Sequence, residues 1–329
     1  MREWTRDTQA RVIDAASFGF INLLQCRARA GSHSEAEMRD YIDRWKEASL
    51  QDFYTIPESF PDPELPERGS FRHPSPLSGG CPHNDRVHLD FFPATTGWKA
   101  PVMFMLHGVM SVSDVGYRLW AKKLNSLGWS AAFFHLPYHY GRTPPRSLSG
   151  EMALTANLIR TSEGIRQAVV ELRWIMRAMK KKGVPHIGLW GTSYGGWIAS
   201  LLCCLESCLN TAWLLEPIVD IDWAIWESPA TRTVQRQLRQ RGISRETVAQ
   251  HVRLVCPSHH RPVLDNQKII LMAGLFDRIA HPDTIRSLAS HWNIAHYAEI
   301  RQGHVGYQLM PKSLNLARQV MPDLFSNYR

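Results

Sequence analysis

The sequence predicts an α/β protein in which a mostly parallel central sheet carries helices on both faces. Short, largely apolar runs suited to buried strands alternate along the chain with longer segments of helical pattern. The length of 329 residues, the apolar fraction of 44% and the charged fraction of 21% are typical of a globular chain with a large core. The expected parallel strands lie at 101–106, 130–134, 187–190, 212–215, 268–272 and 296–300.

Charge and cysteine content narrow the possible functions. The net charge of +8 indicates anionic partners, but no compact basic tract or nucleic-acid motif accompanies it, so no nucleic-acid partner is expected. The six cysteines lack zinc-site spacing, and Cys203, Cys204 and Cys208 share one expected helix as buried thiols. This usage favours a reducing, cytoplasmic location. No apolar run reaches the roughly 18 residues of a membrane-spanning helix.

The first 66 residues are expected to form a helical extension and a linker, followed by the main domain over 67–329. One helix is predicted over 2–30. A second begins after Ser34, where Glu37 three residues on completes a capping box. The extension either packs on the core or presents a surface to a membrane or a second subunit.

A secretion signal within residues 15–26 is an alternative for the first helix. Glu3, Asp7 and Asp14 oppose it, because the start of a signal is basic rather than acidic. We therefore expect this segment to remain part of the folded chain.

The remaining elements follow from turns and helical periodicity. Two early antiparallel strands are expected after a proline-rich segment, and helical patterns separate the later strands. The early strands lie at 70–72 and 87–91, and the helices at 113–127, 151–182, 197–205 and from about Gln308.

The strand pattern stops at about 222–264, where a small helical cap is expected with helices over 230–240 and 244–254. From residue 228 to 262, seven arginines stand against one acid, Glu246. Two interpretations remain open: a solvated helix face, or a basic lid that attracts an anionic substrate or membrane surface.

The sequence Gly191-Thr192-Ser193-Tyr194-Gly195 links an expected strand to an expected helix. A serine at such a sharp strand-to-helix turn needs small residues two positions away on either side, because the flanking backbone approaches closely. This context favours a nucleophile elbow over an ordinary glycine-rich turn, with Ser193 as the nucleophile.

Two further residues fit this assignment. Asp277 lies just beyond the strand at 268–272, and His304 lies in a glycine-flanked loop after the strand at 296–300. The order serine, aspartate, histidine is the order of a hydrolase triad built on such a sheet. Glu216, just after the strand at 212–215, is the rival candidate for the acid.

On these residues, and on His107-Gly108 after the strand at 101–106, the chain resembles the α/β-hydrolase superfamily over residues 68–329. The segment 135–142 with the long helix after it is similar to the branch called abhydrolase domain-containing protein eighteen. The resemblance implies the α/β-hydrolase fold and cleavage of esters, thioesters or amides.

The expected chemistry follows from these roles. His304 takes the proton of Ser193, and Asp277 fixes the imidazole. The backbone N–H groups of Tyr194 and Val109 form the oxyanion hole. No metal or other cofactor is expected.

The substrate is expected to be a small-molecule or lipid ester, with an acyl-enzyme intermediate. Trp223, Trp226 and His107 are expected to contact it, although tryptophans at this spacing also suit a core. The alternatives are a non-catalytic binding module of the same fold, or a thioesterase, peptidase or acyltransferase. The oligomeric state stays open.

Overall fold

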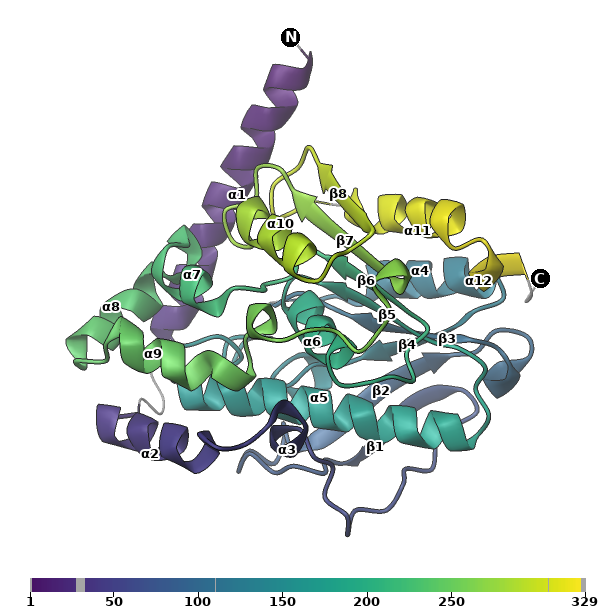
Figure 1. Ribbon diagram of the computed structural model, residues 1–329, viewed down its shortest axis with the longest axis horizontal. Coiled ribbons are helices and arrows are strands. Elements are labelled where there is room, and N and C mark those ends of the chain that lie inside the picture. Colours follow the sequence, from purple (N-terminus) through teal and green to yellow (C-terminus); the bar gives the residue numbers. More distant parts are fainter. Residues whose placement is uncertain (1, 28–32, 110, 307, 327–329) are drawn as a thin grey trace.

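An eight-stranded sheet forms the centre of the molecule, in a computed structural model that describes residues 2–27, 33–109, 111–306 and 308–326 (Figure 1). The strand order is β1-β2-β4-β3-β5-β6-β7-β8. β2 is antiparallel to both neighbours, and every other pairing is parallel. The strands are β1 (Gly69–Pro74), β2 (Arg86–Phe92), β3 (Val102–Leu106), β4 (Ser130–Phe134), β5 (Ile187–Thr192), β6 (Thr211–Leu215), β7 (Ile269–Gly274) and β8 (His296–Ile300).

The central strands of the sheet are buried on both faces, which confirms the fold class expected from the apolar runs. In β3 every residue is buried, and alternate side chains enter two different hydrophobic clusters. Val102, Phe104 and Leu106 pack on one face. Met103 and Met105 pack on the other. This period of two is what a pleated strand between two helical layers requires.

Helices cover both faces of the sheet (Figure 1). α5, α6 and α10 pack on the side of Val102, and α4 and α11 on the side of Met103. No helix in the described part of the chain is long and apolar enough to cross a membrane. The bounds are α3 (Leu50–Phe53), α4 (Val115–Asn125), α5 (Leu158–Lys181), α6 (Tyr194–Cys203), α10 (Pro282–His291), α11 (Leu309–Val320) and α12 (Asp323–Ser326).

The N-terminal helices pack against the rest of the molecule. α2 (Glu35–Trp45) starts with the expected capping box at Ser34 and places Met38 and Tyr41 in the main core. α1 (Arg2–Arg27) lies against the cap, and its N-terminal end extends beyond the sheet (Figure 1). The side chain of Asn22 accepts the N–H of Thr233 at 2.8 Å and donates to the carbonyl oxygen of Pro229.

Several helix boundaries differ from expectation, and local structure explains two of these differences. α5 begins at Leu158 rather than 151, because the side chain of Asn157 accepts the N–H of Arg160 and caps the helix there. In the cap, the second expected helix is shorter, since a 3₁₀ turn replaces its last residues. The cap helices are α7 (Ile221–Trp226), α8 (Arg232–Gln240) and α9 (Arg245–His251).

A buried ion pair ties the turn after β4 to α5. The guanidinium of Arg142 donates to both carboxylate oxygens of Glu171, at 2.6 and 2.9 Å, and both side chains are fully buried. Arg142 also donates to the carbonyl oxygen of Asn84. Removing one partner of such a pair leaves the other charge without compensation in a region of low dielectric constant.

We predict that Glu171→Gln lowers the free energy of unfolding by about 3 kcal/mol, because Arg142 would remain charged and buried. Urea denaturation measures this loss. The matched control is Glu35→Gln, which breaks the exposed pair between Glu35 and Arg39 on α2 and should leave stability unchanged. Equal effects of the two substitutions would contradict the assigned role of the buried pair.

Candidate active site

Ser193 stands at the turn between β5 and α6 in a backbone conformation that side chains rarely adopt. Its φ is 54° and its ψ is −115°. A non-glycine residue there costs of order 1–3 kcal/mol, so the surroundings must hold it in place. A Cβ on Gly191 would lie 2.5 Å from the carbonyl oxygen of Gly195, and a Cβ on Gly195 would meet the backbone of Leu106. The glycines therefore permit the approach that lifts Ser193 above the sheet.

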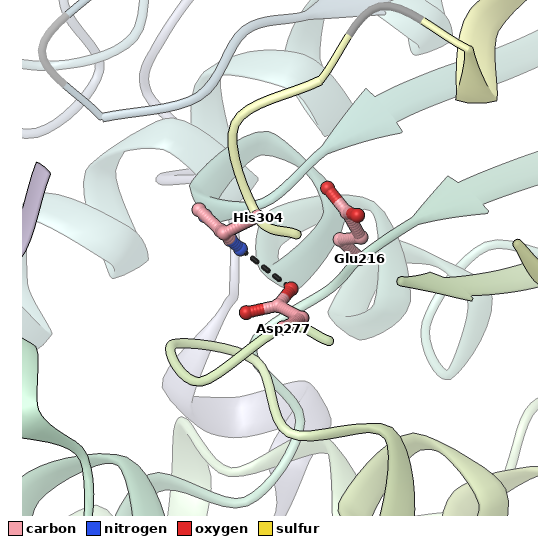
Figure 2. Close-up of side chains that lie close together, drawn as sticks. All are labelled: Glu216, Asp277 and His304. Atoms are coloured by element: carbon pink, nitrogen blue, oxygen red, sulfur yellow. Dashed lines mark hydrogen bonds and ion pairs between the residues drawn. The ribbon is translucent and has the colours of Figure 1, made fainter. Parts of the chain in front are cut away.

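His304 connects Ser193 to Asp277 by two hydrogen bonds. The hydroxyl of Ser193 lies 2.8 Å from Nε2 of His304. Nδ1 of His304 lies 2.7 Å from Oδ2 of Asp277 (Figure 2). The carboxylate can only accept, so Nδ1 carries the hydrogen and Nε2 is free to accept from the serine. Asp277 is itself fixed, because its Oδ1 accepts the N–H groups of Ile279 and Ala280.

Glu216 lies beside this group but is not bonded to the imidazole. Its carboxyl accepts from the side-chain amide of Gln302 at 2.9 Å. Burial, and next the charge of Asp277, raise the pKa of Glu216 well above its ordinary value. The geometry thus pairs His304 with Asp277, and Glu216 bonds to Gln302 instead.

A metal site is an alternative interpretation of this group, because the ligand atoms of Glu216, Asp277 and His304 lie within 4.8 Å of one another. The donor chemistry argues against it. Both ring nitrogens of His304 already form hydrogen bonds, and a raised pKa makes Glu216 less ready to lose the proton that a metal ligand must give up.

The pKa of His304 is raised above its ordinary value. Burial alone would lower it, but the charge of Asp277, the hydrogen bond from that residue and the charge of Asp14 together outweigh burial. These carboxylates favour the imidazolium, which is the form that His304 takes when it has accepted a proton.

The predicted oxyanion-hole residues lie on two sides of Ser193. Tyr194 is the first residue of α6, and the first N–H groups of a helix have no partner within it. The loop after β3 also reaches Ser193, since a Cβ on Gly108 would lie 3.6 Å from the Cβ of Ser193. Val109 lines the cavity in front of the serine.

Three predicted substrate contacts lie elsewhere. His107 is fully buried, with Nε2 accepting the N–H of Leu136 and Nδ1 donating to the carbonyl oxygen of Gly108, so it braces the loop. Trp223 packs against His281, and Trp226 lies under the guanidinium of Arg239. None of the three is among the described residues that line the cavity.

The cavity in front of Ser193 has a volume of about 680 Å³. α7 contributes Ile221, Ala224 and Ile225, which share the helix face opposite to Trp223 and Trp226. The described lining residues include no aspartate, glutamate, lysine or arginine. α1 supplies a complete wall, made of Ile13, Ala16, Ser17, Phe20, Ile21 and Gln25.

α1 also contributes Asp14, which the sequence did not mark as a site residue. Asp14 is fully buried, and its carboxylate accepts the N–H of His304 at 2.8 Å and the N–H of Val305 at 3.1 Å. The sequence signal that could have revealed it is helical periodicity, which places Asp14 on the same face of α1 as the apolar residues Phe18 and Ile21.

Solved structures with this arrangement of elements are esterases and peptidases. Acetyl xylan esterase 1 from Thermoanaerobacterium sp. JW/SL YS485 matches with a TM-score of 0.59 and 14% identity, over 88% of this chain and 94% of that one. The chain has the α/β-hydrolase fold. An acetyl xylan esterase from Paenibacillus sp. R4 gives 0.58, with 16% identity over 91% and 98% of the two chains. The acylaminoacyl peptidase of Pyrococcus horikoshii gives 0.53, with 14% identity over 80% and 42%.

The relatives found by sequence comparison have no assigned activity. Uncharacterized proteins from two strains of Mycobacterium tuberculosis are 29% identical over 201 residues, which are 58% of this chain and 45% of each relative. The chain thus spans about half the length of these relatives. No family model matches. The comparisons establish the α/β-hydrolase fold and not the narrower similarity to abhydrolase domain-containing protein eighteen.

We predict that Asp277→Asn lowers the pKa of His304, because the charge and the hydrogen bond that favour the imidazolium are both lost. Titration of the His304 ring signals by NMR measures the change. Glu216→Gln is the matched control and should leave that pKa nearly unchanged, since Glu216 bonds to Gln302 and not to the imidazole of His304. A larger shift in the Glu216 variant would assign the acid to Glu216.

Proposed function

We propose that this protein is a serine hydrolase that cleaves neutral carboxylic esters with largely apolar acyl groups, through an acyl-enzyme intermediate. The observation behind the proposal is the hydrogen-bonded chain Ser193–His304–Asp277 at the strained strand-to-helix turn. A binding module of the same fold has no need of an imidazole placed 2.8 Å from a strained serine.

In the proposed reaction, Oγ of Ser193 attacks the ester carbonyl carbon while Nε2 of His304 takes the hydroxyl proton. The negative charge develops on the carbonyl oxygen, beside the N–H groups of Tyr194 and Val109. Collapse of this intermediate expels the alcohol, which leaves with the proton from His304. Water then attacks the acyl-enzyme with His304 again as base, which releases the carboxylic acid and restores Ser193.

The cavity supports a neutral and mostly apolar substrate. Its volume of about 680 Å³ is within the usual range for small-molecule sites, and its described lining has no ionisable carboxylate, amine or guanidinium. A peptidase that holds a free peptide terminus, or an enzyme for an anionic substrate, would need such a group. We therefore favour esters over charged peptides.

The arginines of the cap are partly used within the fold. Arg245 pairs with Asp222 and Glu227, and Arg253 donates to backbone carbonyl oxygens at the end of α2. These contacts favour a structural role for the local charge excess, so the proposal does not depend on an anionic membrane surface.

The test is covalent labelling with a fluorophosphonate. We predict that the wild-type protein is labelled at one position and that Ser193→Ala abolishes labelling with no change in melting temperature. The matched control is Ser200→Ala, on the same helix, where the buried hydroxyl donates only to the carbonyl oxygen of Gly196. The Ser200→Ala variant should be labelled by the fluorophosphonate at the wild-type rate.

Tryptic mapping should place the label on Ser193. No labelling of the folded wild-type chain, together with no turnover of p-nitrophenyl esters, would leave the binding module as the better assignment. Full labelling of Ser193→Ala would show that a different residue is the nucleophile.

A further inference from the structure

The loop that carries His304 is attached to α1 through its backbone. Oδ2 of Asp14 accepts the N–H of His304 at 2.8 Å, and Oδ1 accepts the N–H of Val305 at 3.1 Å. Hydrogen bonds to an ionised acceptor are among the stronger ones in proteins. The Asp14 side chain itself is fully buried, and both hydrogen bonds are partly buried. The position of the imidazole therefore depends on a residue 290 positions earlier in the chain.

The loop is built to receive this carboxylate. A Cβ on Gly303 would lie 2.5 Å from Oδ1 of Asp14 and 2.6 Å from its Cγ. The φ of Gly303 is not in the left-handed region, so its conformation does not require glycine. The close approach of α1 requires it instead.

Other contacts place α1 across the site and the cap. Phe18 packs with Ala230 and Ile279, and Arg301 pairs with Asp7 near the start of the helix. The same helix forms the wall of the cavity opposite the core. Docking of α1 thus completes the cavity and fixes the His304 loop at the same time.

The charges around His304 come from three elements. Asp277 follows β7, Glu216 follows β6 and Asp14 belongs to α1; of these, Glu216 has a pKa raised well above its ordinary value, first by burial. The nearby arginines lie over aromatic rings: Arg11 and Arg301 over Phe276, and Arg278 over Phe18. Within the described part of the chain, no arginine forms an ion pair with Asp14, whose carboxylate binds the backbone of His304 and Val305.

Burial raises the pKa of Asp14, while the two backbone N–H groups oppose this rise. The two hydrogen bonds are those expected of an ionised carboxylate, which can only accept. In that form Asp14 adds to the effect of Asp277 and raises the pKa of His304.

We propose that Asp14 is a positioning residue of this active site, and that α1 is an integral part of the catalytic machinery rather than an appendage. The inference rests on the proposed hydrolase function and adds a fourth residue that acts through His304. It assigns to α1 two roles, a wall for the acyl group and a support for the general base.

The first test compares Asp14→Asn with Glu35→Gln on p-nitrophenyl acetate. Asp14→Asn should lower kcat by about 10²-fold, as small displacements of a catalytic group do, with little change in KM. Loss of the charge should also move the acid limb of kcat/KM to lower pH, since His304 is then protonated only at lower pH. Glu35→Gln removes only the exposed pair with Arg39 on α2 and should leave both kcat and the acid limb unchanged. A lower melting temperature with unchanged kcat and acid limb would overturn the proposal.

The second test is a double-mutant cycle between Asp14→Ala and Gly303→Ala. Gly303→Ala pushes the carboxylate away without changing any charge, so each single substitution should lower kcat. In the double variant the added methyl group occupies the space that the carboxylate has left. Its kcat should then be no lower than the kcat of the less active single variant. Losses that multiply within about twofold would show independent sites and contradict the coupling.

The hydrolase assignment is tested separately from the role of Asp14, with the wild-type chain. If that chain is neither labelled by a fluorophosphonate nor active on any ester, the hydrolase assignment fails. The positioning inference is then decided by NMR titration of His304 with and without Asp14→Asn. A lower pKa in the variant supports the role of Asp14, and an unchanged pKa overturns it.

Discussion

The hydrogen bonds of His304 are the interaction on which the rest of the site depends. One ring nitrogen faces Ser193, the other faces Asp277, and the backbone N–H is held by Asp14. These three partners come from the turn after β5, the loop after β7 and the N-terminal helix. The parallel strands bring the ends of β5, β7 and β8 to one edge of the sheet, and this is how these groups come together here.

The strained serine shows how the fold compensates for a functional cost. A positive φ at Ser193 costs of order 1–3 kcal/mol, a notable share of the 5–15 kcal/mol by which domains are stable. The surrounding β3, β5 and β6 are almost entirely buried, and α6 is buried along its whole length. Gly191 and Gly195 let these elements close around the turn. The strain at Ser193 thus lies where the proposed reaction needs an accessible hydroxyl.

The sequence was sufficient to predict those features that depend on residues close together in the chain. Each strand has a short apolar run, and the turn at Ser193 has glycines at fixed offsets, so both could be predicted from neighbours in the chain. Asp277 and His304 were found because each follows an apolar run. The carboxyl ends of parallel strands share one edge, which made their proximity to Ser193 predictable.

The remaining features depend on tertiary contacts. Asp14 becomes part of the site only because α1 docks against Gly303, and no local pattern encodes that docking. The helical phase of α7 turns Trp223 and Trp226 away from the cavity, whereas composition alone suggested an acyl pocket. The role of His107 depends on the backbone of Leu136, which packing brings next to it.

The most direct test of the account is the detection of the acyl-enzyme itself. The protein would be mixed with p-nitrophenyl octanoate, quenched in acid within the first turnover, and examined by intact-mass and peptide mass spectrometry. The account predicts one octanoyl group per chain, on the peptide that contains Ser193, which disappears as hydrolysis proceeds. Turnover without any adduct, or an adduct on a different residue, would contradict the assignment of Ser193 as the nucleophile.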